Sequence, residues 1–285
     1  MTASPYGQTG GSVVPPVCPR HPDRVSYVRC QRCDRPVCPE CQRPAPVGVQ
    51  CVDCVARAQA AMPTRRTVFG GRARDGRPVV TISLVVLCIV VFAAQRVTSG
   101  VNTALFFVPA FGEAEPYRFL TAAFLHGSFL HLALNMYALW IVGSVLEPAL
   151  GRWRFLALYL VSALGGSVGV LLFASPFAQE QWWGAVVGAS GAVFGMFGAV
   201  ALALRRVGRD ATQILVLIAI NTVLGFTVPN IAWQAHLGGL VTGLALAAAY
   251  VYAPRKRSTA VSVLATVGVT AVVVALAVGK YALLP

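Results

Sequence analysis

The chain contains the stretch Gly184-Ala-Val-Val-Gly188-Ala-Ser190-Gly191-Ala-Val-Phe194-Gly195-Met-Phe-Gly198, which decides its fold. The stretch is uncharged and dense in small residues, and small residues let neighbouring helix backbones approach closely inside a membrane. Such a composition predicts a tightly packed membrane helix, in which a serine can bond to its own helix backbone. Ser190 is also a candidate nucleophile, because polar groups inside membrane helices are costly to keep and often functional.

Composition extends this prediction to most of the chain. The 285 residues are 56% hydrophobic and only 12% charged, with a mean hydropathy of +0.68, which is too apolar for an ordinary soluble domain. We therefore expect an all-α polytopic membrane protein. Apolar runs of roughly 20 residues predict seven membrane helices, at residues 79–95, 119–145, 155–173, 185–204, 214–228, 233–252 and 261–284.

Charge predicts how these helices are oriented. Most of the 23 Lys and Arg residues fall on one side of the predicted helices, whereas Arg96, Arg118 and Lys280 flank the other. By the positive-inside rule we expect a cell-membrane protein with a cytoplasmic N-terminus and a C-terminus outside. The net charge of +13 then reflects topology and attraction to anionic membrane lipid. Nucleic-acid binding is not expected, since basic and aromatic residues are not interleaved.

Composition also divides the chain into segments. Residues 1–17 predict a disordered N-terminus without a cleavable signal peptide, because no charged start precedes an apolar core. A small cysteine-rich domain covers residues 18–55, and the basic stretch 56–78 predicts a flexible linker. Six membrane helices form the core at residues 79–253, and residues 254–285 supply a linker and the seventh helix.

Seven of the eight cysteines lie within the first 54 residues. With one histidine they form four pairs spaced by two residues, which supply the eight ligands that two tetrahedral zinc ions require. A disulfide scaffold is the alternative, but a cytoplasmic location and the histidine favour zinc. Four protein ligands per ion predict structural sites, and so short a domain needs the metal to fold. The predicted ligands are Cys18, His21, Cys30, Cys33, Cys38, Cys41, Cys51 and Cys54; Cys88, in the first membrane helix, is expected to pack.

Three further polar residues lie in the predicted membrane helices. His131 and Asn135 are four residues apart and share one helix face, although polar pairs of this kind also join helices by hydrogen bonds. His236 precedes Gly239 and Gly243, which form a small-residue face on the sixth helix. Each signal alone is also explained by packing.

The predicted topology brings these residues to one depth. The second, fourth and sixth helices run from outside to inside, and Ser190 and His236 lie in the first turns of theirs. His131 is expected some turns into a longer second helix whose outer end projects, and His126 is expected at the membrane interface. A serine and a histidine at one depth supply a nucleophile and its base. No acidic residue lies near them, so a catalytic triad is not expected.

This combination resembles the rhomboid family of intramembrane serine proteases over about residues 79–253. The resemblance implies a six-helix core with an added seventh helix, and cleavage of transmembrane segments of other proteins without a cofactor. It implies a dyad of Ser190, the nucleophile, and His236, the general base and acid, with His131, Asn135 and the Ser190 N–H as the oxyanion hole. It rests on Tyr117-Arg118-Phe-Leu-Thr, His126, His131, Asn135, Gly143-x3-Glu147, Gly188-Ala-Ser190-Gly191 and Ala235-His236-x2-Gly239-x3-Gly243.

The cysteine spacing resembles a B-box zinc finger. This resemblance implies an interleaved pairing, although the spacing alone leaves sequential pairing open. A cytoplasmic partner or the membrane surface is the expected docking target of the domain. The interleaved ligand sets are Cys18, His21, Cys38 and Cys41 for one zinc, and Cys30, Cys33, Cys51 and Cys54 for the other.

Two features depart from the family pattern. The loop between residues 98 and 116 lacks tryptophan, and Phe194 stands where many members have tyrosine. An inactive rhomboid-like protein that binds transmembrane helices is the main alternative, against which the retained Ser190 and His236 argue. A transporter is disfavoured by the lack of intramembrane acidic chains and repeats. A zinc protease is disfavoured by the lack of His-Glu-x-x-His.

Overall fold

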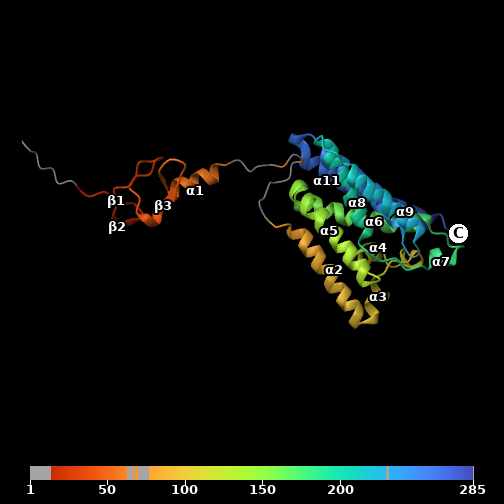
Figure 1. The fold of residues 1–285 in the computed structure, drawn as a ribbon. Helices are drawn as coiled ribbons and strands as arrows, with labels where there is room; N and C mark the ends of the chain where they lie inside the picture. Colours follow the sequence, from red (N-terminus) through yellow and green to blue (C-terminus); the bar gives the residue numbers. More distant parts are fainter. Residues whose placement is uncertain (1–13, 63–66, 68, 70–76, 229–230, 285) are drawn as a thin grey trace, which may run out of the picture. The chain divides into compact units, whose positions relative to one another are not determined.

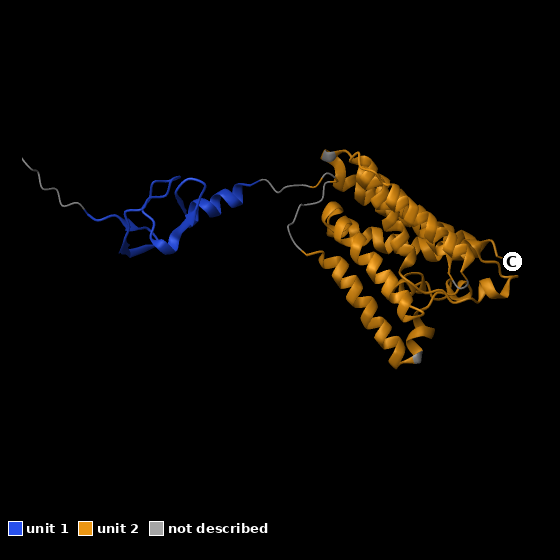
Figure 2. Ribbon diagram, viewed as in Figure 1, with its two compact units in different colours: residues 1–64 blue, residues 65–285 orange. Residues whose placement is uncertain are grey.

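The computed structural model describes residues 14–62, 67, 69, 77–228 and 231–284 (Figure 1). The chain divides into two compact units, residues 1–64 and residues 65–285 (Figure 2). Most of the predicted disordered N-terminus and much of the predicted linker lie outside the described residues.

The first unit contains two β-hairpins and a helix. Its apolar core consists of Val37 and six buried cysteines, too few side chains to stabilise a domain without metal or cross-links. Helix α1 continues past the predicted domain end at residue 55, because its alanine-rich second half favours a helix. The elements are β1 (Val17–Cys18) paired with β2 (His21–Val25), η1 (Pro39–Cys41), β3 (Gln42–Pro44) paired with β4 (Val49–Cys51), and α1 (Val52–Ala61).

The described part of the second unit is a bundle of seven long helices with short elements between them (Figure 1). The long helices are α2 (Val79–Val97), α5 (Phe129–Leu150), α6 (Arg152–Phe173), α8 (Ser190–Arg206), α9 (Thr212–Thr227), α10 (Trp233–Tyr252) and α11 (Ser258–Ala282). The short elements are α3 (Ser99–Leu105), η2 (Pro109–Phe111), α4 (Arg118–Thr121), η3 (Ala122–Phe124), α7 (Gln179–Trp182) and η4 (Arg255–Arg257).

Five of these helices, α2, α5, α6, α10 and α11, are long and apolar enough to cross a membrane. Helices α8 and α9 have 17 and 16 residues, fewer than the roughly 20 that a straight crossing needs. The expected class, an all-α polytopic membrane protein, is confirmed. The protein is an integral membrane protein.

Helix α6 is the most deeply buried of the five spans, and α8 and α10 pack against it and against each other. Glycines make these contacts. A Cβ atom on Gly169 would lie 3.0 Å from Cα of Gly238, and one on Gly191 would lie 3.3 Å from Cα of Gly166. The helices therefore meet backbone to backbone, as small residues permit in membranes.

Glu147, near the end of α5, caps the first turn of α2. The carboxylate is 3% exposed and accepts hydrogen bonds from the backbone N–H groups of Val80 (3.0 Å) and Thr81 (2.8 Å) and from the Thr81 hydroxyl (2.8 Å). A carboxylate at a helix N-terminus satisfies unpaired N–H groups and is stabilised by the helix dipole. Glu147 thus ties α2 to the bundle.

The predicted starting residue of the second membrane helix was wrong. It was expected from residue 119, but α4 and η3 occupy that segment and α5 begins only at Phe129. Ser128, with φ −148° and ψ 164°, caps α5 by accepting a hydrogen bond from the His131 N–H at 3.1 Å. Serine is among the strongest N-cap residues, so the helix starts at this position rather than one segment earlier.

The fourth predicted helix also starts later than expected, at Ser190 instead of residue 185. The preceding segment is extended, and Val186 exchanges two backbone hydrogen bonds with Phe107, of 2.8 and 3.1 Å. Gly188 has φ +129°, a conformation that glycine adopts far more readily than other residues. The segment 184–189 therefore leads directly into the first turn of α8.

Candidate functional site

Three of the predicted site residues lie at the N-termini of helices. His131 lies in the first turn of α5, Ser190 is the first residue of α8, and His236 lies in the first turn of α10. The expected position of His131 some turns into its helix was wrong, because α5 begins at Phe129. A helix N-terminus carries partial positive charge and unpaired N–H groups, which favour negative charge nearby.

Ser190 and His236 flank a close contact between α8 and α10. A Cβ atom on Gly191 would lie 3.2 Å from the carbonyl oxygen of Ala235, and one on Gly239 would overlap the Gly191 backbone. Ser190 immediately precedes Gly191, and His236 immediately follows Ala235. The glycine contact therefore brings the two residues to neighbouring positions on the two helices.

Phe194, one helical turn after Ser190, orients the ring of His236. The two rings stack with centroids 4.2 Å apart and planes 11° apart. Within the described residues, Nδ1 of His236 is buried without a hydrogen bond, and no hydrogen bond joins the ring to Ser190. The imidazole is thus oriented by an aromatic face and not by a carboxylate.

His131 lies beside the backbone that leads to Ser190. A Cβ atom on Gly188 would lie 2.8 Å from both Cε1 and Nε2 of His131 and 3.7 Å from Oγ of Ser190. The imidazole and the hydroxyl therefore approach the same side of a residue that has no side chain. Nδ1 of His131 accepts the Gly127 N–H at 3.4 Å, which assigns the ring proton to Nε2, on the side of Gly188.

Asn135 lies one turn further along α5 and is 7% exposed. Its amide nitrogen donates to the carbonyl of His131 at 2.9 Å. The amide group has two N–H donors, and this bond uses one of them. Asn135 and His131 are thus joined within one turn of helix.

His126, which was expected at the membrane interface, is buried, with 1% of its surface exposed. Its ring meets the ring of His131 edge-on, with centroids 5.2 Å apart, and neither ring nitrogen has a hydrogen-bond partner within the described residues. Gln95 of α2 holds its backbone, through a 3.1 Å bond from the His126 N–H and a 3.3 Å bond to its carbonyl. Sequence reasoning missed Gln95, whose only signal is an amide near the end of an apolar helix.

Arg118 holds the connection between α2 and α5. Its side chain is buried and donates to the carbonyls of Thr103 (2.8 Å) and Phe106 (2.9 Å), and it forms an ion pair with Glu115. An arginine has five donors in a fixed planar arrangement, which lets one side chain tie several backbone groups together. The loop is therefore ordered although it lacks the tryptophan of the family pattern.

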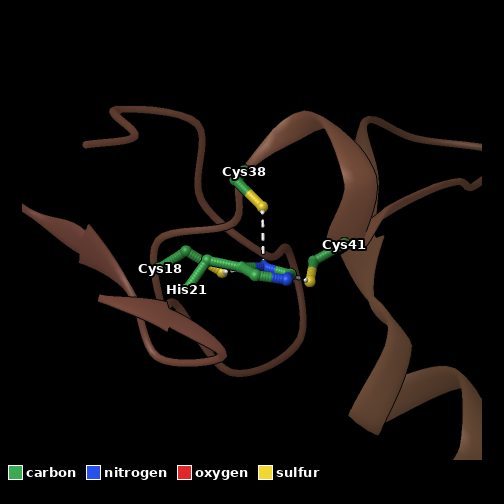
Figure 3. Close-up of side chains that lie close together, drawn as sticks. All are labelled: Cys18, His21, Cys38 and Cys41. Carbon is green, nitrogen blue, oxygen red and sulfur yellow. Dashed lines mark hydrogen bonds between the residues drawn. The ribbon is translucent and has the colours of Figure 1, made fainter. Parts of the chain in front are cut away.

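In the first unit, the eight predicted metal ligands gather into two groups, and within each group the ligand atoms all lie within 4.8 Å of one another. Figure 3 shows the first group, in which Nδ1 of His21 faces the sulfur atoms of Cys38 at 3.2 Å and Cys41 at 3.5 Å. Three sulfurs with one nitrogen, and four sulfurs, are donor sets of structural zinc sites. The groups are Cys18, His21, Cys38 and Cys41, and Cys30, Cys33, Cys51 and Cys54, the interleaved arrangement that the B-box resemblance implies.

The pKa values of two thiols in the first group are shifted in opposite directions. The backbone of Cys38 hydrogen-bonds Cys18 and lowers the pKa of its thiol to about 6, whereas burial raises the pKa of Cys41 to about 11. A bound metal ion deprotonates its thiol ligands outright. On the far side of the ring, Nε2 of His21 lies 3.7 Å from the carboxylate of Glu40, the type of outer partner that orients metal-binding histidines.

Fold and site together define an integral membrane protein in which a serine and a histidine lie on two helices whose backbones are in contact, joined to a small domain with two cysteine-rich metal-ligand groups. The chain belongs to the rhomboid family. The family model for the Rhomboid domain matches residues 113–253.

Individual relatives agree with this family. Rhomboid protease GluP of Bacillus subtilis (strain 168) is 36% identical over 211 residues, which cover 68% of this chain and 38% of that protein. RHOMBOID-like protein 5 of Arabidopsis thaliana is 36% identical over 47% of this chain and 44% of its own length. Putative rhomboid protease YdcA of Bacillus subtilis (strain 168) is 33% identical over 46% of this chain and 66% of its own length. At the level of the family, these relatives support an intramembrane protease.

Proposed function

We propose that the protein is an intramembrane serine endopeptidase that cleaves transmembrane segments of other membrane proteins. The observation that carries the proposal is the contact of Gly191 with Ala235, because it brings Ser190 and His236 to neighbouring positions on two helices. A nucleophile and its base must come within hydrogen-bond reach, and this distance is often longer in the free enzyme than in the substrate complex.

In the proposed reaction, His236 takes the proton of the Ser190 hydroxyl while Oγ attacks the scissile carbonyl carbon. The resulting tetrahedral intermediate collapses, the C–N bond breaks, and His236 gives the proton to the leaving amine. Water, deprotonated by His236, then attacks the acyl-enzyme, and the Ser190 oxygen leaves with the returned proton. The stacked Phe194 ring holds the imidazole for these transfers.

The developing negative charge on the carbonyl oxygen is stabilised by preset donors. We assign this role to the Ser190 backbone N–H, to Nε2–H of His131 and to the free amide hydrogen of Asn135. Ser190 begins α8, so its N–H is not needed by the helix and the helix dipole favours negative charge there. Fixed donors in a site of low polarity stabilise an oxyanion more than water does.

The chain is proposed to lie in the cell membrane with its N-terminus in the cytoplasm and its C-terminus outside. Basic residues near the helix ends would then contact anionic lipid of the inner leaflet.

The two ligand groups of the first unit are assigned to two structural zinc ions, held by four protein ligands each. Such closed sites have no open position for chemistry. The domain is proposed to dock a cytoplasmic partner.

The test is cleavage of a transmembrane reporter by the purified full-length chain in liposomes, together with labelling by a serine-reactive fluorophosphonate. Ser190→Ala should abolish both cleavage and labelling, and His236→Ala should abolish cleavage, while both variants remain folded by circular dichroism. If wild-type protein cleaves no reporter but binds transmembrane peptides, the protein is an inactive rhomboid-like helix-binding adaptor. Full cleavage by either variant would contradict the dyad.

A further inference from the structure

Helix α11 lies beyond the residues that the family model matches, yet its C-terminal end contacts segments near the proposed nucleophile. The Tyr281 hydroxyl donates to the carbonyl of Pro109 at 2.7 Å. The Tyr281 ring also meets the ring of Trp182 in α7 edge-on, with centroids 6.4 Å apart. One side chain of the last helix thus touches the loop before α4 and the short helix before the 184–189 segment.

Pro109 is connected to the nucleophile by a short series of backbone bonds. Two residues earlier, Phe107 is fully buried and exchanges its two hydrogen bonds with Val186. Two residues after Val186, the N–H of Gly188 donates to the carbonyl of Ala122 at 2.9 Å. The segment that leads into Ser190 is therefore held by the bridge to Phe107 on one side and by η3 on the other.

This segment requires external support because of its own sequence. Gly188 has φ +129°, and glycine loses more conformational freedom on ordering than any other residue. Arg118 fixes the earlier part of the supporting loop, at Thr103 and Phe106. Tyr281 fixes the later part, at Pro109.

We propose that Tyr281 is a positioning residue for catalysis: by holding Pro109 it keeps the Phe107–Val186 bridge in place, and the bridge sets the position of Gly188 and Ser190. This inference rests on the proposed protease function. It gives the seventh helix a role in the active site that is separate from membrane anchoring. Only the hydroxyl makes the bond to Pro109, so its removal isolates the effect.

The test compares full-length wild-type protein with Tyr281→Phe in liposomes. We measure kcat and KM for a transmembrane reporter, the rate of fluorophosphonate labelling of Ser190, and amide hydrogen exchange by mass spectrometry. Tyr137→Phe, which removes a hydroxyl from an exposed position on α5, is the matched control. Loss of one hydrogen bond should lower kcat and the labelling rate together by about two- to tenfold, with KM unchanged. Exchange should rise only in peptides that cover residues 105–112 and 184–190.

A second variant keeps the proposal falsifiable if Tyr281→Phe folds poorly. A Cβ atom on Gly112 would collide with the Tyr281 hydroxyl and lie 2.9 Å from the Phe119 ring and 3.1 Å from the Phe107 ring. Gly112→Ala should therefore displace the hydroxyl, press on the bridge residue Phe107 as well, and reproduce the kinetic and exchange changes. Wild-type kinetics and wild-type exchange in both variants would overturn the proposal. A rise in exchange throughout the bundle would also overturn it, because that result assigns Tyr281 to general stability.

The same experiment separates this inference from the proposed function. If wild-type protein neither cleaves the reporter nor reacts with the probe, the protease function fails. The exchange comparison still reports whether Tyr281 orders the 184–190 segment. If wild-type protein is active and Tyr281→Phe behaves like Tyr137→Phe, the positioning role alone fails.

Discussion

Phe194 of α8 stacks on His236 of α10, with the ring centroids 4.2 Å apart and the planes inclined by only 11°. The two residues belong to the helices whose backbones meet at Gly191 and Ala235. The close backbone approach places the aromatic ring directly over the imidazole. No acidic side chain is hydrogen-bonded to the histidine within the described residues, so stacking is what restricts its ring.

The stack predicts that the aromatic face at position 194 matters more than a hydroxyl. Phe194→Leu should lower kcat by up to about tenfold, since an aromatic pair contributes roughly 0.5–1.5 kcal/mol beyond burial. Phe194→Tyr keeps the face and should retain most activity. The measurement is reporter cleavage in liposomes, with Phe155→Leu, which changes a buried ring on α6, as the control. An equal loss of kcat in both leucine variants would contradict a specific role of the stack.

The membrane helices could be predicted because apolar length is visible in the sequence, but two of their starting points could not. The Ser128 cap and the Phe107–Val186 bridge decide where α5 and α8 begin. The Ser128 cap is a local signal, but it lies within a long apolar run that was interpreted as one helix. The bridge joins residues that are far apart in the chain. The correction at α5 moves His131 to the first turn of its helix, where it lies beside Gly188.

The metal-ligand residues could be predicted from spacing, because pairs separated by two residues suit a tetrahedral ion. Their grouping depends on which hairpins pack together, which spacing alone does not determine. Tyr281 carried no signal in the sequence, and Gln95 carried only that of an amide near the end of an apolar helix. Each acts through a backbone carbonyl of a distant loop, and the position of such a carbonyl is known only after the chain has folded.

The proposed oxyanion role of Asn135 can be separated from its helix bond. Asn135→Ala should lower kcat by about 10²–10³, the usual effect of removing one oxyanion donor, with little change in KM. Asn221→Ala is a matched control, because Asn221 of α9 also donates to the carbonyl four residues earlier, at 2.9 Å. Steady-state kinetics on the transmembrane reporter provide the comparison. Similar kcat values for the two variants would remove Asn135 from the oxyanion hole.

The crossing of α8 and α10 predicts a strong dependence on glycine. Gly239→Ala would place a methyl group in the Gly191 backbone, and overpacking of this kind typically destabilises by about 1–3 kcal/mol. It should lower both the thermal unfolding temperature and the cleavage rate. Gly268→Ala is the control, because a Cβ atom there meets nothing within 4 Å. Thermal unfolding in detergent and reporter cleavage are measured for the two variants. A wild-type unfolding temperature for Gly239→Ala would show that the two helices lie further apart.

The interleaved grouping of metal ligands predicts which site each cysteine supports. Cys38→Ala should destroy the group that contains His21 and leave the four-cysteine group intact, so zinc content should fall from two ions per chain to one. Cobalt(II) in the remaining site should give the absorption spectrum of four thiolate ligands. Sequential pairing gives the opposite result, because Cys38 would then belong to the four-cysteine site and the remaining spectrum would show a histidine nitrogen.

Cys88→Ser, which changes a cysteine outside both groups, should keep both ions. Reporter cleavage should be unchanged in Cys38→Ala, since the metal ligands lie in a separate compact unit from Ser190 and His236.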